Sequence, residues 1–504
     1  MIKGWTGKRL RIDLSLQKAW SEDIPLRDLQ QWLGGRGLNA SFFSQHFQSP
    51  VSLSSPENPI AFAVGPLTGT LAPCSGWTSI GSFSPLSDTP IYSFTRMPGY
   101  FGASLKGAGF DQLILQGKAD QPIYLWIDGG EVKFEEASHL WGKETTETTV
   151  AIQEEKEDRS IEVLCIGPAG ERQIPFANVI HRLSWTGDYL GLGYLFGVKQ
   201  LKAIAIRGMK EVTLHDPRQF LNLCLTLKDR IQKDRKMQKL KEGGKFSFLS
   251  REGKMMLKNG NGWLHPGLAK EWSTFLRTYL SSKEGCFSCP VHCGRNIQHQ
   301  ESYFGGIHLE KAWYLGPQIG VYNGEWTLKL HRFCQSQGLD PFLTSSLLTG
   351  IMGGSESGPL SEEDLRQTEN IEDQGEKAFI ILHRIINGSR KEFHLATPPV
   401  SESKDLDVLA DIISFCLIVV KHLNLRTVSN MIDLIYAATG YSLSKEDLRD
   451  IVRNILQMES RLQNNKGLHP SDESPFPHLG DGQINEILRK EEGNNESIVH
   501  RATS

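Results

Sequence analysis

The sequence predicts an α+β protein, in which a β-rich N-terminal half is followed by mainly helical segments. Up to about residue 208, glycine and proline separate short runs of β-branched and aromatic residues, a composition typical of strands joined by turns. After Pro217, apolar residues recur at helical spacing instead. The chain has 504 residues, more than one hydrophobic core normally holds, so we expect two or three domains.

The first predicted domain, residues 1–211, should contain several strands. Five runs bounded by turn residues are the candidates: residues 60–64, 112–116, 123–127, 161–166 and 203–206. Gly129 and Gly130 lie between two of the β-type runs, where glycine allows the positive φ that a tight hairpin turn needs. We therefore expect a sheet-rich domain that includes a hairpin at these glycines.

The helical part should form two further domains, residues 212–400 and 401–504. Its long helical segments are predicted at residues 218–240, 326–337, 406–423, 428–438 and 445–463. Ser444 and Asp447 form a capping box that starts the last of these. The polar stretch 353–404 predicts a variable connection around one helix.

Composition excludes several classes of protein. Hydrophobic residues make up 39% and charged residues 22% of the chain, which is ordinary for a globular protein. The formal net charge is -3 and the densest basic stretch, residues 233–245, is short, so we expect no nucleic-acid partner. The N-terminus lacks the apolar region of a signal peptide, and the longest apolar run, residues 412–420, is too short to cross a bilayer. We expect a cytoplasmic protein without a membrane partner, in which a tight group of cysteines indicates a metal site.

Cys286, Cys289 and Cys293 place three thiols within eight residues. Thiolates are soft ligands that favour iron–sulfur clusters or zinc. A zinc knuckle with His292 as a nitrogen ligand is the alternative to a cluster. A fourth ligand must come from elsewhere in the chain, and spacing alone leaves five candidates: Cys74, Cys165, Cys224, Cys334 and Cys416.

Several motifs together resemble the aldehyde:ferredoxin oxidoreductase family of tungsten-pterin enzymes. They are residues 34–38, 65–70, 99–102, 167–171 and 202–206, and the Cys-x2-Cys-x3-Cys-Gly-Arg motif that ends at Arg295. The resemblance implies an N-terminal β domain that forms the base for two pterins holding one tungsten or molybdenum. It also implies two helical domains above that base and a 4Fe-4S cluster beside the pterin. Cys416, which closes the motif that starts at Asp411, is implied as the fourth cluster ligand, and the other four cysteines are then packed thiols.

The same resemblance implies oxidation of an aldehyde or related carbonyl, with electrons passing through the cluster to ferredoxin or another redox subunit in a homo- or hetero-oligomer. Glu310 matches a family glutamate near the metal, where it would be catalytic in proton transfer, although it also fits an exposed helix glutamate. Asp340 and Asp411 match carboxylates that accept hydrogen bonds from pterin amines, and Asp340 equally fits a helix cap. Arg36 and Arg96 stand at further cofactor-binding positions, Arg96 in place of a family asparagine.

Other positions depart from the family. Residues 185–193 replace an arginine- and glycine-rich stretch that binds pterin phosphates, and Trp185, Asp188 and Tyr189 cannot make those contacts. Trp77 stands where a family arginine would bridge pterin and cluster. These changes predict a narrowed pterin pocket. They favour an alternative function, a catalytically degenerate, cluster-bearing electron-transfer or scaffold subunit that has lost the tungstopterin.

Overall fold

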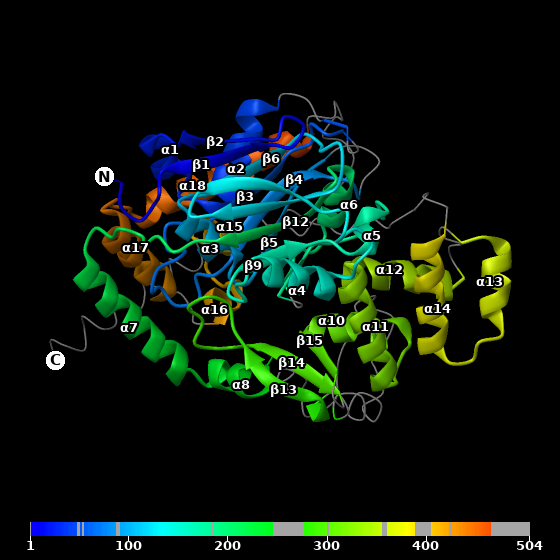
Figure 1. Ribbon diagram of the computed structural model, residues 1–504. Helices are drawn as coiled ribbons and strands as arrows, with labels where there is room; N and C mark the ends of the chain where they lie inside the picture. The colour runs from blue at the N-terminus through cyan, green and yellow to red at the C-terminus, as the bar shows by residue number, and fades with distance from the viewer. Residues whose placement is uncertain are drawn as a thin grey trace.

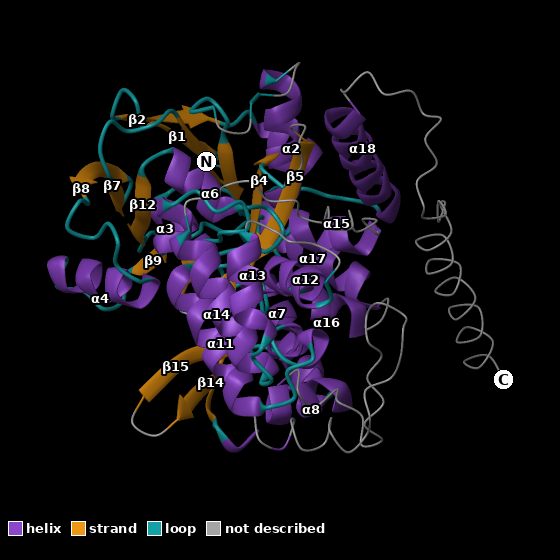
Figure 2. Cartoon of the chain, turned by 90° about the vertical axis from the view of Figure 1, so that its right-hand side faces the viewer, coloured by secondary structure: helices purple, strands orange, loops and turns teal. Residues whose placement is uncertain are grey.

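The computed structural model describes residues 2–464 apart from 48–50, 53–54, 87–90, 183–184, 245–273, 275–276, 300–301, 355–359, 389–404 and 423–425. Two six-stranded sheets come first in the chain and a mainly helical region follows (Figure 1). In Figure 2 the strands of these two sheets lie in the upper part of the view, and most helices lie beside and below them. The predicted α+β class is confirmed.

The first sheet has the strand order β2-β1-β6-β3-β4-β5. Its strands are β1 (Lys8–Asp13), β2 (Lys18–Asp23), β3 (Ile60–Ala63), β4 (Thr78–Ser84), β5 (Ile91–Met97) and β6 (Gln112–Gln116). In this sheet β1 and β6 pair in parallel, and the other neighbours are antiparallel. The strands predicted at residues 60–64 and 112–116 are confirmed as β3 and β6.

The second sheet has the order β11-β10-β9-β12-β7-β8. Its strands are β7 (Ile123–Asp128), β8 (Glu131–Glu136), β9 (Glu162–Cys165), β10 (Ile180–His181), β11 (Trp185–Thr186) and β12 (Leu201–Arg207). The predicted hairpin joins β7 to β8, with φ of 58° at Gly129 and 107° at Gly130. This pairing confirms the predicted hairpin. Glycine tolerates the positive φ that so short a loop requires.

A hydrophobic core lies between the two sheets. Apolar side chains of the first sheet, such as Phe62 and Leu113, share it with side chains of the second, such as Leu125 and Ile204. Helices α3 (Phe101–Ala108) and α6 (Leu192–Val198) contribute to this core. The opposite face of the first sheet is covered by α2 (Gly35–His46) and by the C-terminal end of α18 (Lys445–Asn464), and that of the second sheet by α4 (Thr145–Glu155).

The helical region begins with α7 (Pro217–Lys233) and α8 (Arg235–Gly243). A single helix over residues 218–240 was a wrong prediction. The Asp234 carboxylate accepts hydrogen bonds from the backbone N–H groups of Lys236 and Met237, so it caps the start of a second helix.

A second predicted helix, residues 406–423, is also divided, into α15 (Asp405–Ile412) and α16 (Leu417–His422). Ser414 has a φ of 59° between them, a conformation that no helix continues through. The break presents Cys416 at the start of α16. Helix α16 is followed by α17 (Arg426–Thr439).

The capping box predicted for α18 is confirmed. The Asp447 carboxylate accepts from Ser444 N–H, and the Ser444 hydroxyl accepts from Asp447 N–H.

The remaining helices form a separate layer with its own hydrophobic core. They are α10 (Leu309–Tyr314), α11 (Gly324–Gln337), α12 (Pro341–Met352), α13 (Glu362–Glu369) and α14 (Gln374–Asn387). Shorter helical elements include α1 (Leu26–Trp32), α5 (Pro168–Glu171) and η2 (Pro317–Ile319). The stretch 353–404 contains α13 and α14 in its described part, so the prediction of one helix there was wrong.

A third sheet, which the sequence did not predict, consists of β13 (Leu280–Glu284), β14 (Gly294–His299) and β15 (Ser302–Ile307). These strands carry too few apolar residues to show the alternation that marks a half-buried strand. Within the described ranges, every helix is too short or too polar to cross a lipid bilayer. The boundaries at residues 211 and 400 stay predictions.

Candidate metal centre

The cysteine motif forms the loop between β13 and β14. Ser288 and His292 have positive φ angles of 54° and 50°, so the backbone reverses sharply within the loop. A Cβ atom on Gly285 would lie 2.6 Å from His292 Cδ2, so a larger residue there would require the His292 side chain to shift. Cys289 is buried while the His292 side chain is exposed. The loop therefore turns a thiol inward and its histidine outward.

Two distant loops hold this cysteine loop in place. The Cys74 backbone N–H donates to Ser288 O at 3.0 Å, and the Cys416 N–H donates to Cys74 O at 2.8 Å. Trp77 N–H donates to Ser414 O at 3.3 Å, which ties the two distant loops to each other. The segments around residues 74, 288 and 416 therefore interlock through their backbones.

This interlocking brings the four predicted ligands together. Cys289 and Cys416 belong to one hydrophobic cluster, and Cys286 and Cys293 pack against it. Burial raises the pKa of the Cys286 thiol well above its ordinary value. Cys286 and Cys293 are half-buried, and Cys289 and Cys416 are buried. The structure thus gathers four soft ligand atoms from two parts of the chain.

Cys74 is a fifth thiol at the same place. Its Sγ lies 3.9 Å from Cys289 Sγ, and its side chain is buried. The pKa of Cys289 is lowered to about 7, mainly by the hydrogen bond from Cys74. Burial opposes this shift, and the backbone N–H groups of His292 and Val291 add to it. Sequence reasoning missed this contact and placed Cys74 among the packed thiols; the available signal was a cysteine beside the glycine-rich motif at residues 65–70.

The other three cysteines are packed thiols, as predicted. Cys165 lies in the core outside the second sheet, Cys224 on α7, and Cys334 in the core of α10 to α14. Burial raises the pKa to about 11 for Cys165 and to about 12 for Cys224 and Cys334. Among the described residues, no three His, Cys, Asp or Glu side chains are arranged to hold a single metal ion.

Arg295 ties the cysteine loop to α8. Its guanidinium is buried and donates to the carbonyl oxygens of His292, Gly294 and Lys241, each at 2.7 Å. Burial lowers the pKa of Arg295, and the Cys293 sulfur opposes that shift. A cation therefore lies close to one of the clustered thiols.

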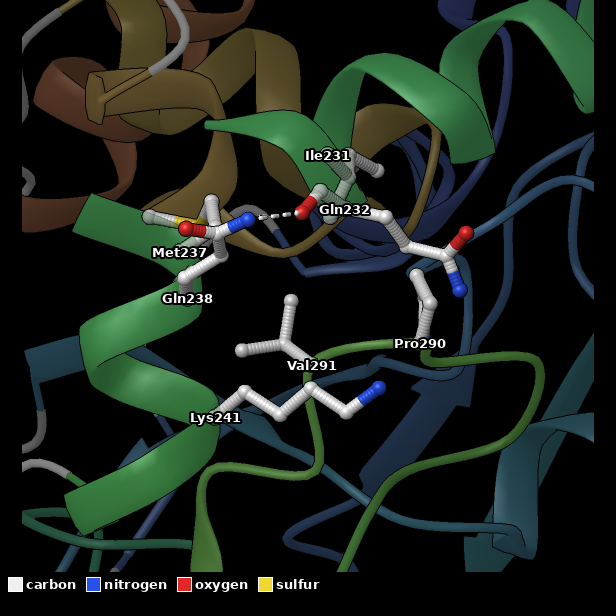
Figure 3. A pocket seen from close by; sticks show the side chains of 7 residues that line it. All are labelled: Ile231, Gln232, Met237, Gln238, Lys241, Pro290 and Val291. Atoms are coloured by element: carbon white, nitrogen blue, oxygen red, sulfur yellow. Dashed lines mark hydrogen bonds between the residues drawn. The ribbon is translucent and has the colours of Figure 1, made fainter. Parts of the chain in front are cut away.

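A small cavity of about 90 Å³ lies between the cysteine loop and the helices α7 and α8 (Figure 3). Its lining residues are Ile231, Gln232, Met237, Gln238, Lys241, Pro290 and Val291. Gln238 Nε2 donates to Gln232 O at 3.1 Å across one side of it. Organic cofactors occupy pockets of roughly 300–1,000 Å³, so this cavity is too small for a pterin.

The predicted cofactor-binding residues Arg36, Arg96 and Asp411 lie together in one ion-pair network. Arg36 Nη1 lies 3.4 Å from Asp411 Oδ2, and Arg96 Nη1 lies 3.3 Å from Asp411 Oδ1. Burial raises the pKa of Asp411, and the two arginines oppose this shift. Arg96 and Lys421 also pair with Asp407, at 3.6 and 3.0 Å. Both oxygens of Asp411 thus face cations of the chain itself.

Asp340 lies apart from that network, at the N-cap of α12. One oxygen accepts from the backbone N–H groups of Phe342 and Leu343, at 2.9 and 3.2 Å. The other accepts from Tyr189 N–H at 2.7 Å. Burial, followed by the nearby Asp188 carboxylate, raises the pKa of Asp340 to about 7. The helix-cap interpretation of Asp340 is therefore confirmed.

Residues 185–190 belong to the stretch 185–193 that the resemblance places at the phosphate-binding position, and they pack against the rest of the chain. Trp185 is buried and its ring centroid lies 5.7 Å from that of His181. Tyr189 stacks on Phe342 with centroids 4.9 Å apart. Lys311 donates to Thr186 Oγ1 at 2.7 Å. The side chains of Trp185, Thr186 and Tyr189 therefore make their ring contacts and hydrogen bonds with other residues of the chain.

Glu310 is half-buried in the first turn of α10, next to Lys311. The structure places it in the helical layer, on a different element from the cysteine loop. Its catalytic role stays a prediction.

Comparison with known proteins finds two matching family models. Residues 9–208 match the N-terminal domain of aldehyde ferredoxin oxidoreductase, and residues 223–397 match its domains 2 and 3. The tungsten-containing aldehyde ferredoxin oxidoreductase of Pyrococcus furiosus is 31% identical over 377 residues, covering 72% of this chain and 61% of that protein. The chain thus spans about three fifths of the length of this relative and of the other tungsten-containing aldehyde ferredoxin oxidoreductases that it matches.

Two further similarities extend over more of the chain. A WOR-like subunit of aliphatic sulfonate oxidoreductase from Pyrococcus furiosus is 27% identical over 434 residues, covering 80% of this chain and 69% of that subunit. The active-site complex BamBC of benzoyl coenzyme A reductase, solved with 1,5-dienoyl-CoA, shares the fold with a TM-score of 0.78 at 19% identity. That match covers 93% of this chain and 90% of that one. The two family models, the sequence identity and the shared fold agree, and the chain is a divergent member of the aldehyde ferredoxin oxidoreductase family.

Proposed function

We propose that the chain binds one 4Fe-4S cluster through Cys286, Cys289, Cys293 and Cys416, and that it passes electrons between this cluster and another redox protein. The observation that carries the proposal is that these four cysteines, from two loops far apart in sequence, pack in one cluster and that backbone hydrogen bonds through Cys74 join the two loops. The four residues fit such a group, because each iron of the cluster takes one thiolate and the sulfurs need not share an ion. Backbone N–H groups directed at Cys289 suit a thiolate ligand.

Metal analysis of anaerobically purified protein tests the cluster. We expect about four iron and about four acid-labile sulfide per chain. Cys416→Ser should lower both, whereas Cys334→Ser, which changes a buried thiol in another core, should leave both unchanged. Stoichiometric zinc without sulfide would show a zinc-stabilised scaffold instead.

The charge distribution near the cysteine loop supports an acidic redox partner such as ferredoxin. Residues 228–242, at the end of α7 and along α8, carry seven lysines and arginines but three acidic residues, although the whole chain has a formal charge of -3. Arg295 donates to Lys241 O on α8 at 2.7 Å. Residues of α8 and Pro290 and Val291 of the cysteine loop also line the same small cavity (Figure 3). A basic surface attracts an acidic protein and accelerates its association at low ionic strength.

Stopped-flow oxidation of the reduced cluster tests this partner surface. Lys236 and Lys239 are exposed on α8, and Lys133 is exposed on β8. We expect Lys236→Glu with Lys239→Glu to slow electron transfer to an acidic ferredoxin about tenfold at low salt and to weaken its salt dependence. Lys133→Glu should have little effect, and transfer to a small uncharged oxidant should be unchanged. Equal rates with ferredoxin for all variants would contradict this surface.

The second candidate is oxidation of an aldehyde with a tungsten or molybdenum bis-pterin, the activity that the names of the tungsten-containing relatives describe. Family membership favours it. The described residues do not fit that group, because Asp340 is fully used as a helix cap, Asp411 faces two arginines, and segment 185–190 carries Asp188 where pterin phosphates need cations. We therefore propose the electron-transfer role first.

Two measurements separate the candidates. The electron-transfer role predicts iron without stoichiometric tungsten or molybdenum, and no reduction of a viologen dye by aldehydes unless a catalytic subunit is added. Tungsten at about one per chain, with aldehyde oxidation that Glu310→Gln slows strongly, would establish the second candidate and the role of Glu310. Aldehyde oxidation that Glu310→Gln leaves unchanged would exclude Glu310 as the catalytic residue.

A further inference from the structure

The centre contains one thiol more than a four-cysteine cluster uses. Cys74 is buried, and its Sγ lies 3.9 Å from Cys289 Sγ. Cys416 lies in the same hydrophobic cluster as Cys74, and Cys286 packs against that cluster. Cys74 therefore belongs to the same group of sulfurs. Cys165 and Cys334 lie in other hydrophobic clusters, and Cys224 lies on α7.

The backbone on both sides fixes where Cys74 points. Its N–H donates to Ser288 O at 3.0 Å, and its carbonyl accepts from Cys416 N–H at 2.8 Å. Its φ of 65° lies in the left-handed region, which non-glycine residues adopt only when their surroundings hold them there. These contacts join Cys74 to both loops that carry the proposed ligands and fix the direction of its Cα–Cβ bond, and the side chain is buried between those loops.

Beside a four-cysteine cluster, Cys74 would be a hydrogen-bond donor and not a ligand. Each of the four irons takes one protein ligand, and Cys286, Cys289, Cys293 and Cys416 supply four. A fifth thiol then keeps its proton, and an S–H group is a weak hydrogen-bond donor. The sulfur of Cys289 lies within reach of that donor.

We propose that Cys74 is a positioning residue for the cluster: its S–H donates a hydrogen bond to the Cys289 ligand sulfur and raises the cluster's reduction potential. This inference rests on the proposed cluster. Reduction adds negative charge that spreads over the ligand sulfurs, so a donor to one of them stabilises the reduced state more than the oxidised state. Hydrogen bonds to the sulfurs are among the factors that set cluster potentials.

The test compares wild type, Cys74→Ala, Cys74→Ser and the control Cys334→Ala, each anaerobically purified. Iron and sulfide are measured first, and the midpoint potential is then measured by redox titration with electron paramagnetic resonance. We expect all four proteins to hold the same iron and sulfide. Cys74→Ala should lower the equilibrium constant for reduction about tenfold, which is about 59 mV for one electron. The midpoint potential of Cys74→Ser, which keeps a donor, should stay closer to that of the wild type. The midpoint potential of Cys334→Ala should equal that of the wild type.

A direct measurement on the wild-type protein complements the variants. After exchange into D2O, pulsed electron paramagnetic resonance of the reduced cluster should detect an exchangeable deuteron that is absent in Cys74→Ala. A full cluster with an unchanged potential in folded Cys74→Ala would overturn the proposal. Loss of one iron in both Cys74→Ala and Cys74→Ser, with the fold retained by circular dichroism, would also overturn it, because Cys74 would then be a ligand. Absence of iron and sulfide from the wild type would instead refute the proposed function itself.

Discussion

Arg36 and Glu459, 423 residues apart in sequence, form a buried bidentate ion pair. Arg36 Nε donates to Glu459 Oε1 at 2.7 Å, and Arg36 Nη2 donates to Oε2 at 2.5 Å. Against the effect of burial, Glu459 and Asp411 raise the pKa of Arg36. The pair joins α2, near the start of the chain, to α18, near the end of the described part, and so fixes α18 against the first sheet (Figure 1).

Glu459→Gln should destabilise the protein by about 3–5 kcal/mol, because it leaves the Arg36 charge buried with one remaining acidic neighbour. The matched control is Asp450→Asn, which breaks the exposed pair between Asp450 and Arg453 on the same helix and should cost about 0–1 kcal/mol. Urea unfolding followed by circular dichroism measures both. If the two substitutions lower the free energy of unfolding equally, burial does not make the Arg36–Glu459 pair more important for stability than an exposed pair.

Gly35→Ala should destabilise the protein by about 3 kcal/mol or more, since a Cβ atom there would lie 2.0 Å from Asp411 O. Gly129 is the control, because it also has positive φ but an added Cβ atom would meet nothing within 4 Å. Gly129→Ala should cost about 1–2 kcal/mol, the strain of the left-handed backbone alone. Thermal unfolding of the two variants separates close approach from backbone conformation, and similar midpoints would contradict the close approach at Gly35.

Arg295→Ala should loosen the cysteine loop, because three carbonyl oxygens lose their donor. Hydrogen bonds from charged groups are each worth about 1.5–3 kcal/mol, and we expect a net loss of about 2–4 kcal/mol. Arg384, which donates to Asp364 O and Gln367 Oε1 between α13 and α14, is the control. Only Arg295→Ala should accelerate iron loss to a chelator. If both variants lose iron at the wild-type rate, Arg295 does not hold the loop around the metal.

Asp340 predicts a specific dependence of stability on pH. Its carboxyl has an ordinary pKa of 3.8 and a folded-state pKa of about 7, so the folded protein binds more protons than the unfolded chain between these values. The contribution of this group to the free energy of unfolding therefore falls as pH rises from about 4 to about 7. Asp340→Asn should flatten that decline, because asparagine keeps one oxygen acceptor but does not titrate.

Thermal unfolding at a series of pH values measures this effect. Asp373→Asn is the control, since Asp373 is the exposed N-cap of α14 and accepts from Glu376 N–H at 2.9 Å. Its melting temperature should change with pH as in wild type. A wild-type slope in Asp340→Asn would show that Asp340 does not hold its proton in the folded state.

The sequence by itself determined the features that short-range chemistry encodes. The α+β class follows from the change of apolar periodicity after Pro217, and the β7–β8 hairpin follows from Gly129 and Gly130. The spacing of Cys286, Cys289 and Cys293 indicated a shared soft-ligand centre, and the motif that ends at Cys416 supplied the fourth thiol of the structural group. Each of these depends on residues that are close in the chain or match a motif.

The tertiary structure alone decided which distant groups meet. Nothing in the local pattern around Cys74 or Arg36 specifies contact with Cys289 or Glu459, because those partners are 215 and 423 residues away and meet only through packing of separate loops and helices. The break at Ser414 was missed for a related reason. Its apolar neighbours continue a helical pattern. The Ser414 carbonyl, however, accepts from Trp77 N–H and the Ser414 hydroxyl accepts from Gly65 N–H, and these bonds favour the left-handed turn that directs Cys416 toward the centre.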